Sequence, residues 1–129
     1  MKRFIYLLGV SLFVFMGMAA AAAEMKYAVI IGTYESQANA DRQLKRLEER
    51  FSTNETMVRL QEENGFDYLT EEVNNFFVVT IKPIIGKEAL DQVYVEAEAF
   101  SSDSYVSLAQ NYMAINYTSP VSGKPVPAV

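Results

Sequence analysis

Three pairs of adjacent carboxylates come nearest to an acid–base pair in this chain: Glu48-Glu49, Glu62-Glu63 and Glu71-Glu72. Acid–base catalysis by two carboxylates requires both side chains to face one reacting bond. Neighbours in sequence, however, point in different directions on a helix or a strand. The spacing therefore predicts solvated surface carboxylates, and we assign no catalytic residue.

The chain lacks the two types of side chain that most often carry out other chemistries. The 129 residues include neither Cys nor His. Disulfides, thiolate ligands and a cysteine nucleophile are thereby excluded, and the commonest metal ligand and general base are missing. Four acidic residues in the second half of the chain lack the dense alternating ligands of a calcium loop: Glu88, Glu96, Glu98 and Asp103. We expect no metal, no cofactor and no enzymatic activity.

The first 23 residues have the pattern of a secretory signal. Lys2 and Arg3 precede an uncharged apolar run that ends in five alanines, 19–23. A short positive segment, an apolar core and an Ala-x-Ala sequence are typical of a signal peptide, here cleaved after Ala23. The uncharged run is also close to the length of a membrane span, about 20 residues, so a retained anchor is the alternative. Because alanine is only weakly lipophilic, we expect cleavage and a periplasmic or secreted protein.

The remainder of the chain has the size of one domain. Cleavage would leave 106 residues and take the formal charge from −5 to −7. An acidic chain is a poor partner for nucleic acid or for an anionic membrane surface. We expect a domain over 24–109, followed by a tail over 110–129 that is rich in Pro and Gly. This tail is predicted to be either irregular or packed on the domain.

Hydrophobic periodicity predicts the element order β-α-α-β-β-α-β. The expected elements are a strand over 27–32, a helix over 36–51, a short helix over 52–64, strands over 66–70 and 76–84, a helix over 87–100 and a strand over 104–108. For the short helix, a strand over 57–60 is the alternative. Two helical crossovers of the usual right hand then predict a ferredoxin-like α+β fold, with two main helices on one face of a four-stranded antiparallel sheet.

Caps and turn residues set the expected ends of these elements. Ser36 is the expected N-cap of the first helix, and either Asn54 or Ser52 caps the short one. The Asn74-Asn75 pair suits a hairpin turn because Asn tolerates positive φ. Pro83 has no amide donor and is expected to end its strand.

Alternation along the strands predicts which side chains face the helices. The helix-facing set is Val29, Ile31, Phe77, Val79 and Ile81, and the set on the opposite face is Ala28, Ile30, Phe76, Val78 and Thr80. An open face with so much Ile, Val and Phe is unusually apolar for a monomer. It requires a cover, which could be the C-terminal tail with Tyr112, a second copy of the chain, or a partner protein.

Two segments resemble the halves of a SPOR (sporulation-related repeat) domain. Val29-Ile-Ile-Gly-Thr-Tyr34, followed by Ser36-Gln-Ala-Asn-Ala40 and Leu44-x-x-Leu47, is similar to the first half. That half has a strand ending in Gly, a small hydroxyl residue and an aromatic residue, and then a helix that starts near an Ala. Asn75-Phe-Phe-Val-Val-Thr-Ile-Lys-Pro-Ile84 is similar to the aromatic-led strand and Pro turn of the second half. The resemblance covers 27–108.

The resemblance implies a non-catalytic periplasmic module that binds the glycan strands of peptidoglycan, often at division sites. The binding surface in that family lies on the side of the sheet away from the main helices. Carried to this chain, the resemblance implies a glycan groove edged by Thr33 and Tyr34, with Phe76 and Thr80 on the neighbouring strand. Tyr105 on the last strand could extend the same platform.

Four positions depart from the family pattern: Ile30 replaces a frequent Gln, Val78 a frequent Arg, Lys82 a Gly, and Ile84 an aromatic residue. Three of these replacements lose a polar or aromatic group that could hold a sugar. The alternative function is therefore an exported protein-interaction module. Its apolar face around Ile30 and Val78 would dock on an envelope protein or on a second copy.

Overall fold

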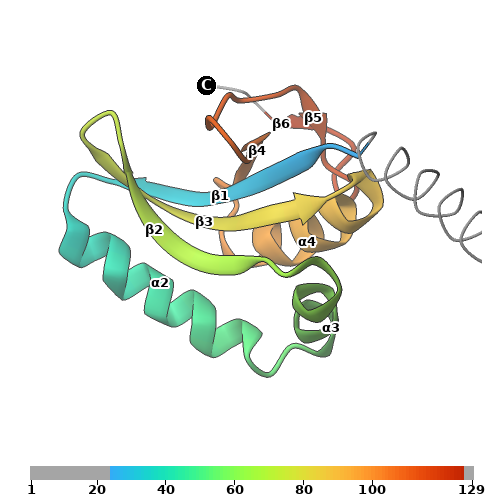
Figure 1. Cartoon of the computed structure of the whole chain (residues 1–129), viewed down its shortest axis with the longest axis horizontal. Coiled ribbons are helices and arrows are strands. Elements are labelled where there is room, and N and C mark those ends of the chain that lie inside the picture. Colours follow the sequence, from blue (N-terminus) through green and yellow to red (C-terminus); the bar gives the residue numbers. More distant parts are fainter. Residues whose placement is uncertain (1–23, 127–129) are drawn as a thin grey trace, which may run out of the picture.

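The structure, a computed structural model of the chain, describes residues 24–126 (Figure 1). Its elements are β1 (Lys26–Tyr34), α2 (Gln37–Phe51), α3 (Glu55–Asn64), β2 (Asp67–Val73), β3 (Phe76–Ile85), α4 (Lys87–Phe100), β4 (Tyr105–Leu108), β5 (Tyr117–Thr118) and β6 (Pro125–Val126). The predicted signal segment, 1–23, lies outside the described residues. Within residues 24–126, no helix combines the length and the apolar character that crossing a bilayer would demand.

The main sheet is four-stranded and antiparallel, in the order β2-β3-β1-β4. Figure 1 shows α2 and α4 on one side of this sheet and α3 beside them. The fold is therefore α+β, as predicted, and its order βααββαβ loosely resembles the ferredoxin-like arrangement. The short helix is confirmed, and the alternative strand at this place is wrong.

Capping and turn chemistry explain where these elements begin and end. The Ser36 hydroxyl accepts a hydrogen bond from the Asn39 amide at 3.1 Å, which confirms the cap of α2. The Asn54 side chain accepts from the Met57 amide at 3.0 Å and caps α3. The Asn74-Asn75 pair has positive φ at both residues, 51° and 68°, and forms the two-residue turn between β2 and β3.

Three strands are longer than predicted, and the first of them, β1, runs over Lys26–Tyr34 where 27–32 was expected. Pro83 does not end its strand, because β3 continues to Ile85. The pairing of β3 with β1 shifts register beside this proline, and a residue in such a bulge needs no ladder hydrogen bond. On its other side, β3 pairs with β2 as far as Val73, beyond the predicted end at Thr70.

The main core lies between the sheet and the helices. From the sheet it contains Val29, Ile31, Val79 and Ile81, and from α2 and α4 it contains Ala40, Leu47, Leu90 and Val93. Phe77 packs against this cluster while half-buried. The predicted helix-facing side chains are therefore confirmed.

The opposite face of the sheet is covered, which corrects the prediction of an open face. Ala28, Ile30 and Val78 form a second buried cluster, against which Tyr112 packs. Ile30 is 0% exposed and Val78 is 4% exposed. The chain after β4 turns back on itself in this region, and the amide of Leu108 donates to the carbonyl of Met113 at 2.9 Å. Of the three expected covers, the C-terminal segment is the one observed.

Tyr112 is fixed over the second cluster by two charged side chains, and we call these three residues the Tyr112 clamp. The Tyr112 hydroxyl donates to Glu71 Oε1 at 2.8 Å, and Lys82 forms an ion pair with the same carboxylate. The Lys82 ammonium also lies 4.4 Å from the centroid of the Tyr112 ring, a cation–π contact. Tyr112 adopts φ of 55°, a conformation that costs free energy for a residue other than glycine.

The clamp makes stability depend on pH on the acid side. The hydrogen bond from Lys82 lowers the pKa of Glu71 below its ordinary value of 4.5, against the opposing effect of burial. A lowered folded-state pKa means that the ionised carboxylate stabilises the fold above its unfolded pKa, and that this contribution is lost as the pH falls through the folded pKa. Because Glu71 is 39% exposed, we expect Glu71→Gln to reduce the free energy of unfolding at pH 7 by at most about 1 kcal/mol.

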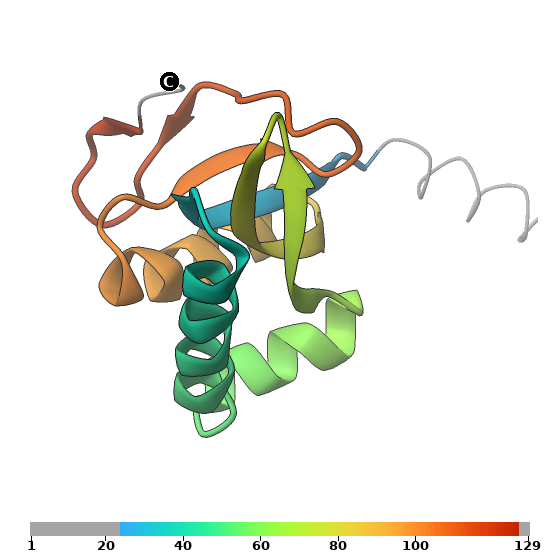
Figure 2. The same cartoon turned by 90° about the vertical axis from the view of Figure 1, so that its left-hand side faces the viewer.

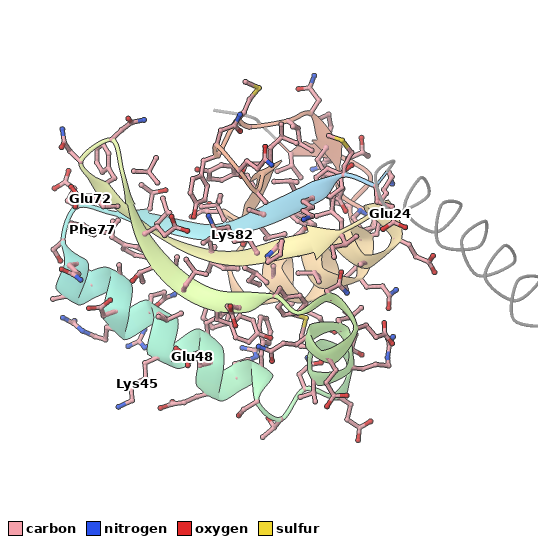
Figure 3. All side chains as sticks on the ribbon, viewed as in Figure 1. Glu24, Lys45, Glu48, Glu72, Phe77 and Lys82 are labelled. Atoms are coloured by element: carbon pink, nitrogen blue, oxygen red, sulfur yellow. The ribbon has the colours of Figure 1, made fainter. Side chains whose placement is uncertain are left out.

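Urea unfolding at pH 7 and pH 3 checks this expectation. The difference between Glu71→Gln and the wild type should shrink at pH 3, where the carboxylate is becoming protonated. Glu72→Gln is the matched control, since Glu72 is exposed and its side chain makes no hydrogen bond or ion pair with the described residues. Figure 3 labels Glu72 and Lys82. An equal loss of stability at both pH values would contradict the assigned electrostatic role of Glu71.

The last described segment, Tyr117–Val126, forms a two-stranded hairpin of β5 and β6, which we call the C-terminal hairpin. Figure 2 shows it beside α4. The Tyr117 hydroxyl donates to Asp91 Oδ1 at 2.6 Å, and its ring meets that of Tyr94 edge-on with centroids 4.9 Å apart. Ser119 Oγ donates to Glu98 Oε2 at 2.7 Å. Residues 110–126 thus cover part of the sheet and then pack on α4.

Candidate functional site

The four predicted site residues do not share one surface. Pairing between β1 and β3 shifts register between Ile30 and Gly32, so an extra residue enters β1 at this point. Beyond the shift, Thr33 pairs with Val78 and lies on the second face, whereas Tyr34 pairs with Phe77 on the face of the helices. Tyr34 accordingly packs against the main core.

Thr80 and Phe76 differ sharply in their access to solvent. Thr80 is 0% exposed, and its hydroxyl donates to the carbonyl of Val29 at 3.2 Å. This threonine is therefore out of reach of a ligand. Phe76 is 43% exposed and follows the Asn turn at the start of β3. The sheet-face platform predicted from the resemblance is consequently not present as a single accessible surface.

Thr33 and Tyr34 instead line a pocket of about 310 Å³ at the edge of the sheet. We call it the edge pocket; its lining consists of Ile31, Gly32, Thr33, Tyr34, Ser101, Asp103 and Tyr105. Strand β4 pairs with β1 only over Tyr27–Ile30. Beyond that point the same edge of β1 has no strand partner among the described residues, and the loop 101–104 lies beside it.

Gly32 allows the Tyr34 ring to fold back over β1. A Cβ atom placed on Gly32 would lie 2.6 Å from the Tyr34 hydroxyl oxygen and 3.0 Å from two ring carbons. Any larger residue at this position would therefore displace the ring. Burial raises the pKa of Tyr34, with a smaller lowering by the charge of Arg46 and a smaller raising by the charge of Asp103. The neutral phenol is thus favoured, and it can donate or accept a hydrogen bond.

The edge pocket has a fixed frame and uncommitted polar groups. Ser101 Oγ donates to the carbonyl of Ile31 at 3.2 Å, which ties the loop to β1. Within residues 24–126, no side-chain hydrogen bond or ion pair engages Thr33, Asp103 or the Tyr105 hydroxyl. These groups are therefore available to a ligand.

A second pocket of about 440 Å³ is also lined by residues of the same loop, and we call it the hairpin pocket. Its lining is Tyr94, Glu98, Ser102, Asp103, Ser104, Tyr105, Ser119, Ser122, Lys124, Pro125 and Val126. Asp103 and Tyr105 line both pockets. The C-terminal hairpin forms one wall, so this pocket depends on a segment that was predicted only as a tail.

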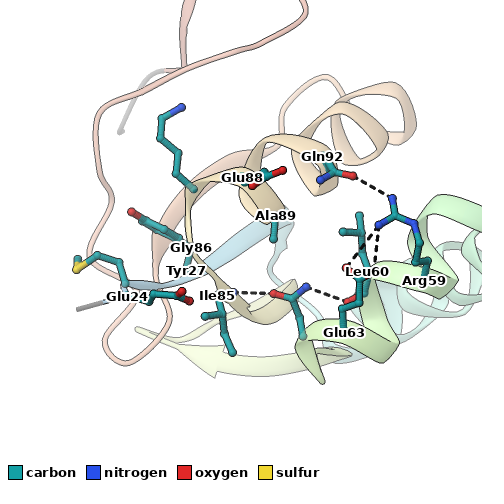
Figure 4. Close-up of a pocket in the computed structure, with 13 residues that line it drawn as sticks. Glu24, Tyr27, Arg59, Leu60, Glu63, Ile85, Gly86, Glu88, Ala89 and Gln92 are labelled. Atoms are coloured by element: carbon teal, nitrogen blue, oxygen red, sulfur yellow. Dashed lines mark hydrogen bonds and ion pairs between the residues drawn. The ribbon is translucent and has the colours of Figure 1, made fainter. Parts of the chain in front are cut away.

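A larger pocket, of about 730 Å³, lies where α3, the start of α4 and the start of β1 meet (Figure 4). Three of its polar side chains, Arg59, Glu63 and Gln92, are engaged with one another. Arg59 pairs with Glu63 at 3.2 Å and donates to Gln92 at 3.0 Å, which ties α3 to α4. The Asn64 side chain accepts from the Ile85 amide at 2.9 Å. These contacts hold α3, α4 and β3 together. None of the predicted site residues lines this pocket.

No family model, curated protein or solved structure matches this chain. The SPOR resemblance therefore stays an interpretation of the residues between 27 and 108. Among the described residues, no group of three or more acidic side chains is placed to hold a metal ion.

Sequence reasoning missed part of the candidate site. Ser101 was assigned no functional role, and Asp103 was considered only as one of four acidic residues without the pattern of a calcium loop. A polar segment beside a short last strand is nevertheless a usual place for a binding loop. Lys124 lay in the predicted tail, where no pattern indicated a fold. The sequence offered no periodic signal for the hairpin, whose two strands have two residues each.

Proposed function

We propose that this protein is a non-catalytic, exported module that binds the glycan strands of bacterial peptidoglycan in the periplasm. The observation that carries the proposal is the edge pocket. It brings two tyrosine rings, Tyr34 and Tyr105, together with the uncommitted polar groups of Thr33 and Asp103. A ferredoxin-like, SPOR-type domain after a cleaved signal is the architecture that we associate with this function.

The chemistry of the edge pocket suits a sugar ring. A pyranose has an apolar face that can stack on an aromatic ring, and it has hydroxyl and acetamido groups around its edge. The carboxylate of Asp103 can accept hydrogen bonds from such groups, and the Thr33 hydroxyl can donate or accept. A pocket with aromatic walls and a few convergent polar groups is typical of small-ligand sites. Binding alone accounts for the presence of these polar and aromatic groups in the pocket.

The proposal places the glycan at the sheet edge and not on the sheet face. In the family pattern, polar residues stand where this chain has Ile30 and Val78. Here both side chains are buried beneath Tyr112. The same burial removes the exposed apolar face on which the alternative function, docking of a partner protein or a second copy, was based.

Co-sedimentation with purified sacculi, before and after amidase treatment, tests the proposal. Amidase removes the stem peptides and leaves the glycan strands. Because the SPOR resemblance implies a preference for glycan strands without stem peptides, we expect the protein to be enriched on the stripped sacculi. No retention on either sample would overturn glycan binding.

Two matched variants locate the site. Tyr34 and Tyr27 lie in the same strand, both are partly buried, and both pack against the main core. Tyr34 lines the edge pocket, whereas Tyr27 lines the larger pocket of Figure 4. We expect Tyr34→Ala to weaken retention about tenfold, the size of one lost aromatic contact, and Tyr27→Ala to leave it unchanged. Thermal unfolding checks that both variants are folded. Loss of retention in Tyr27→Ala, with Tyr34→Ala unchanged, would place the site in the larger pocket.

A further inference from the structure

We infer that the edge pocket and the hairpin pocket form one groove for an extended glycan, and that Lys124 contacts a carboxylate of that glycan. The inference rests on the proposed function. It adds a second subsite and a charge preference. The subsite is built by the C-terminal hairpin, outside the residues that carry the family resemblance.

Two shared side chains make the two pockets adjacent. Asp103 and Tyr105 line both of them, so a ligand that fills one pocket is in reach of the other. The volumes, about 310 and 440 Å³, each lie toward the lower end of the range for ligand pockets, about 300–1,000 Å³. Two adjoining small pockets suit a chain of linked rings better than one compact ligand.

The loop between the two pockets is held in one conformation. The Tyr94 hydroxyl donates to the carbonyl of Ser104 at 2.8 Å, and Ser104 Oγ donates to the carbonyl of Ser101 at 2.8 Å. Ser104 and Tyr94 are both buried. Asp103 is therefore carried by a loop whose two ends are anchored, so little ordering entropy is lost when a ligand binds.

The wall contributed by the hairpin is equally fixed. Ser119 is 2% exposed and joins the hairpin to Glu98 on α4. The same hydroxyl oxygen accepts from the amides of Val121 and Ser122, at 3.2 and 3.3 Å. These bonds set the path of the turn that leads to Lys124. The hairpin pocket is thus formed before any ligand arrives.

Lys124 gives this groove a preference for a carboxylate. Among the described residues, no ion pair or hydrogen bond engages its ammonium group. Amidase-stripped glycan carries a free lactyl carboxylate on each muramic acid unit. The chain from Glu24 onward is acidic overall, with a formal charge of −7, and would repel such a polyanion without a local cation. Asp103 and Glu98 can accept hydrogen bonds from the hydroxyl and amide groups of the sugars.

Two tetrasaccharides test the inference: one prepared from amidase-stripped glycan, and chitotetraose, which has the same length but no carboxylate. We expect the stripped tetrasaccharide to shift the amide NMR signals of Thr33 and Tyr34 together with those of Ser122 and Lys124. Lys124→Gln should lower the affinity for the stripped tetrasaccharide about fivefold, the size of one exposed charge-assisted hydrogen bond. It should leave the affinity for chitotetraose unchanged. The matched control is Lys45→Gln, on the exposed side of α2 (Figure 3), which should change neither affinity.

The outcomes separate this inference from the proposed function. If only the edge pocket responds to the tetrasaccharides, the extended groove is wrong and glycan binding stands. If Lys124→Gln changes both affinities equally, or changes neither, the carboxylate contact is wrong. If neither tetrasaccharide binds and sacculi retain no protein, the proposed function itself is overturned.

Discussion

Ile30→Gln is expected to reduce the free energy of unfolding by about 3 kcal/mol, although Gln is frequent at this position in the family that the chain resembles. Ile30 is fully buried between Ala28, Val78 and the covering Tyr112. The substitution would place an amide in this apolar cluster without hydrogen-bond partners and would lose the packing of a branched side chain. Urea unfolding followed by circular dichroism measures the effect.

Thr33→Gln is the matched control for this substitution. Thr33 lies in the same strand and on the same face, but it is exposed. We expect its replacement to change the free energy of unfolding by less than about 0.5 kcal/mol. A wild-type stability for Ile30→Gln would mean that the second face of the sheet is open to water, and that Tyr112 does not cover it in solution.

Tyr117→Ala is expected to reduce the free energy of unfolding by about 3 kcal/mol and to release the C-terminal hairpin. Its ring is buried against Tyr94, and its hydroxyl donates to Asp91. Truncation removes both contacts and leaves a cavity beside α4. Thermal unfolding measures the loss, and hydrogen exchange should show faster exchange in the hairpin than in the main sheet.

Tyr117→Phe separates the two contacts of this residue. It keeps the ring against Tyr94 and loses only the bond to Asp91, so we expect about 1 kcal/mol of destabilisation. Val121→Ala is the control within the hairpin, because Val121 is exposed and its truncation should have little effect. Unchanged hydrogen exchange in Tyr117→Ala would show that other contacts hold the hairpin on α4.

The sequence predicted the fold class and most elements because those signals are local. Alternation of apolar residues identified the helix-facing side of β1 and β3, since a strand places every second side chain on one face. Ser36 capped its helix as expected, and the Asn74-Asn75 pair formed the hairpin turn as expected. Each of these features depends on residues within a few positions of one another.

Features that depend on distant residues were not predictable in this way. The register shift after Ile30 reverses the faces of Thr33 and Tyr34, and no single-residue pattern marks the shift. Pro83 was expected to end a strand, but an irregularity in the pairing with β1 accommodates it. Tyr112 covers the second face through partners that come from β2 and β3. The candidate site moved to the sheet edge for the same reason.

The central position of β1 has a consequence for how this chain acquires its structure. β1 is the first strand made, yet both its neighbours, β3 and β4, come from much later in the chain. Its apolar residues therefore have no strand to pair with until β3 is free at residue 85, and the other edge of β1 stays unpaired until residue 108. The second face of the sheet stays exposed to water until Tyr112 follows. Pairing of such remote segments is slow. A polypeptide that emerges from a ribosome or a translocation channel amino end first therefore cannot complete this sheet until β4 has passed.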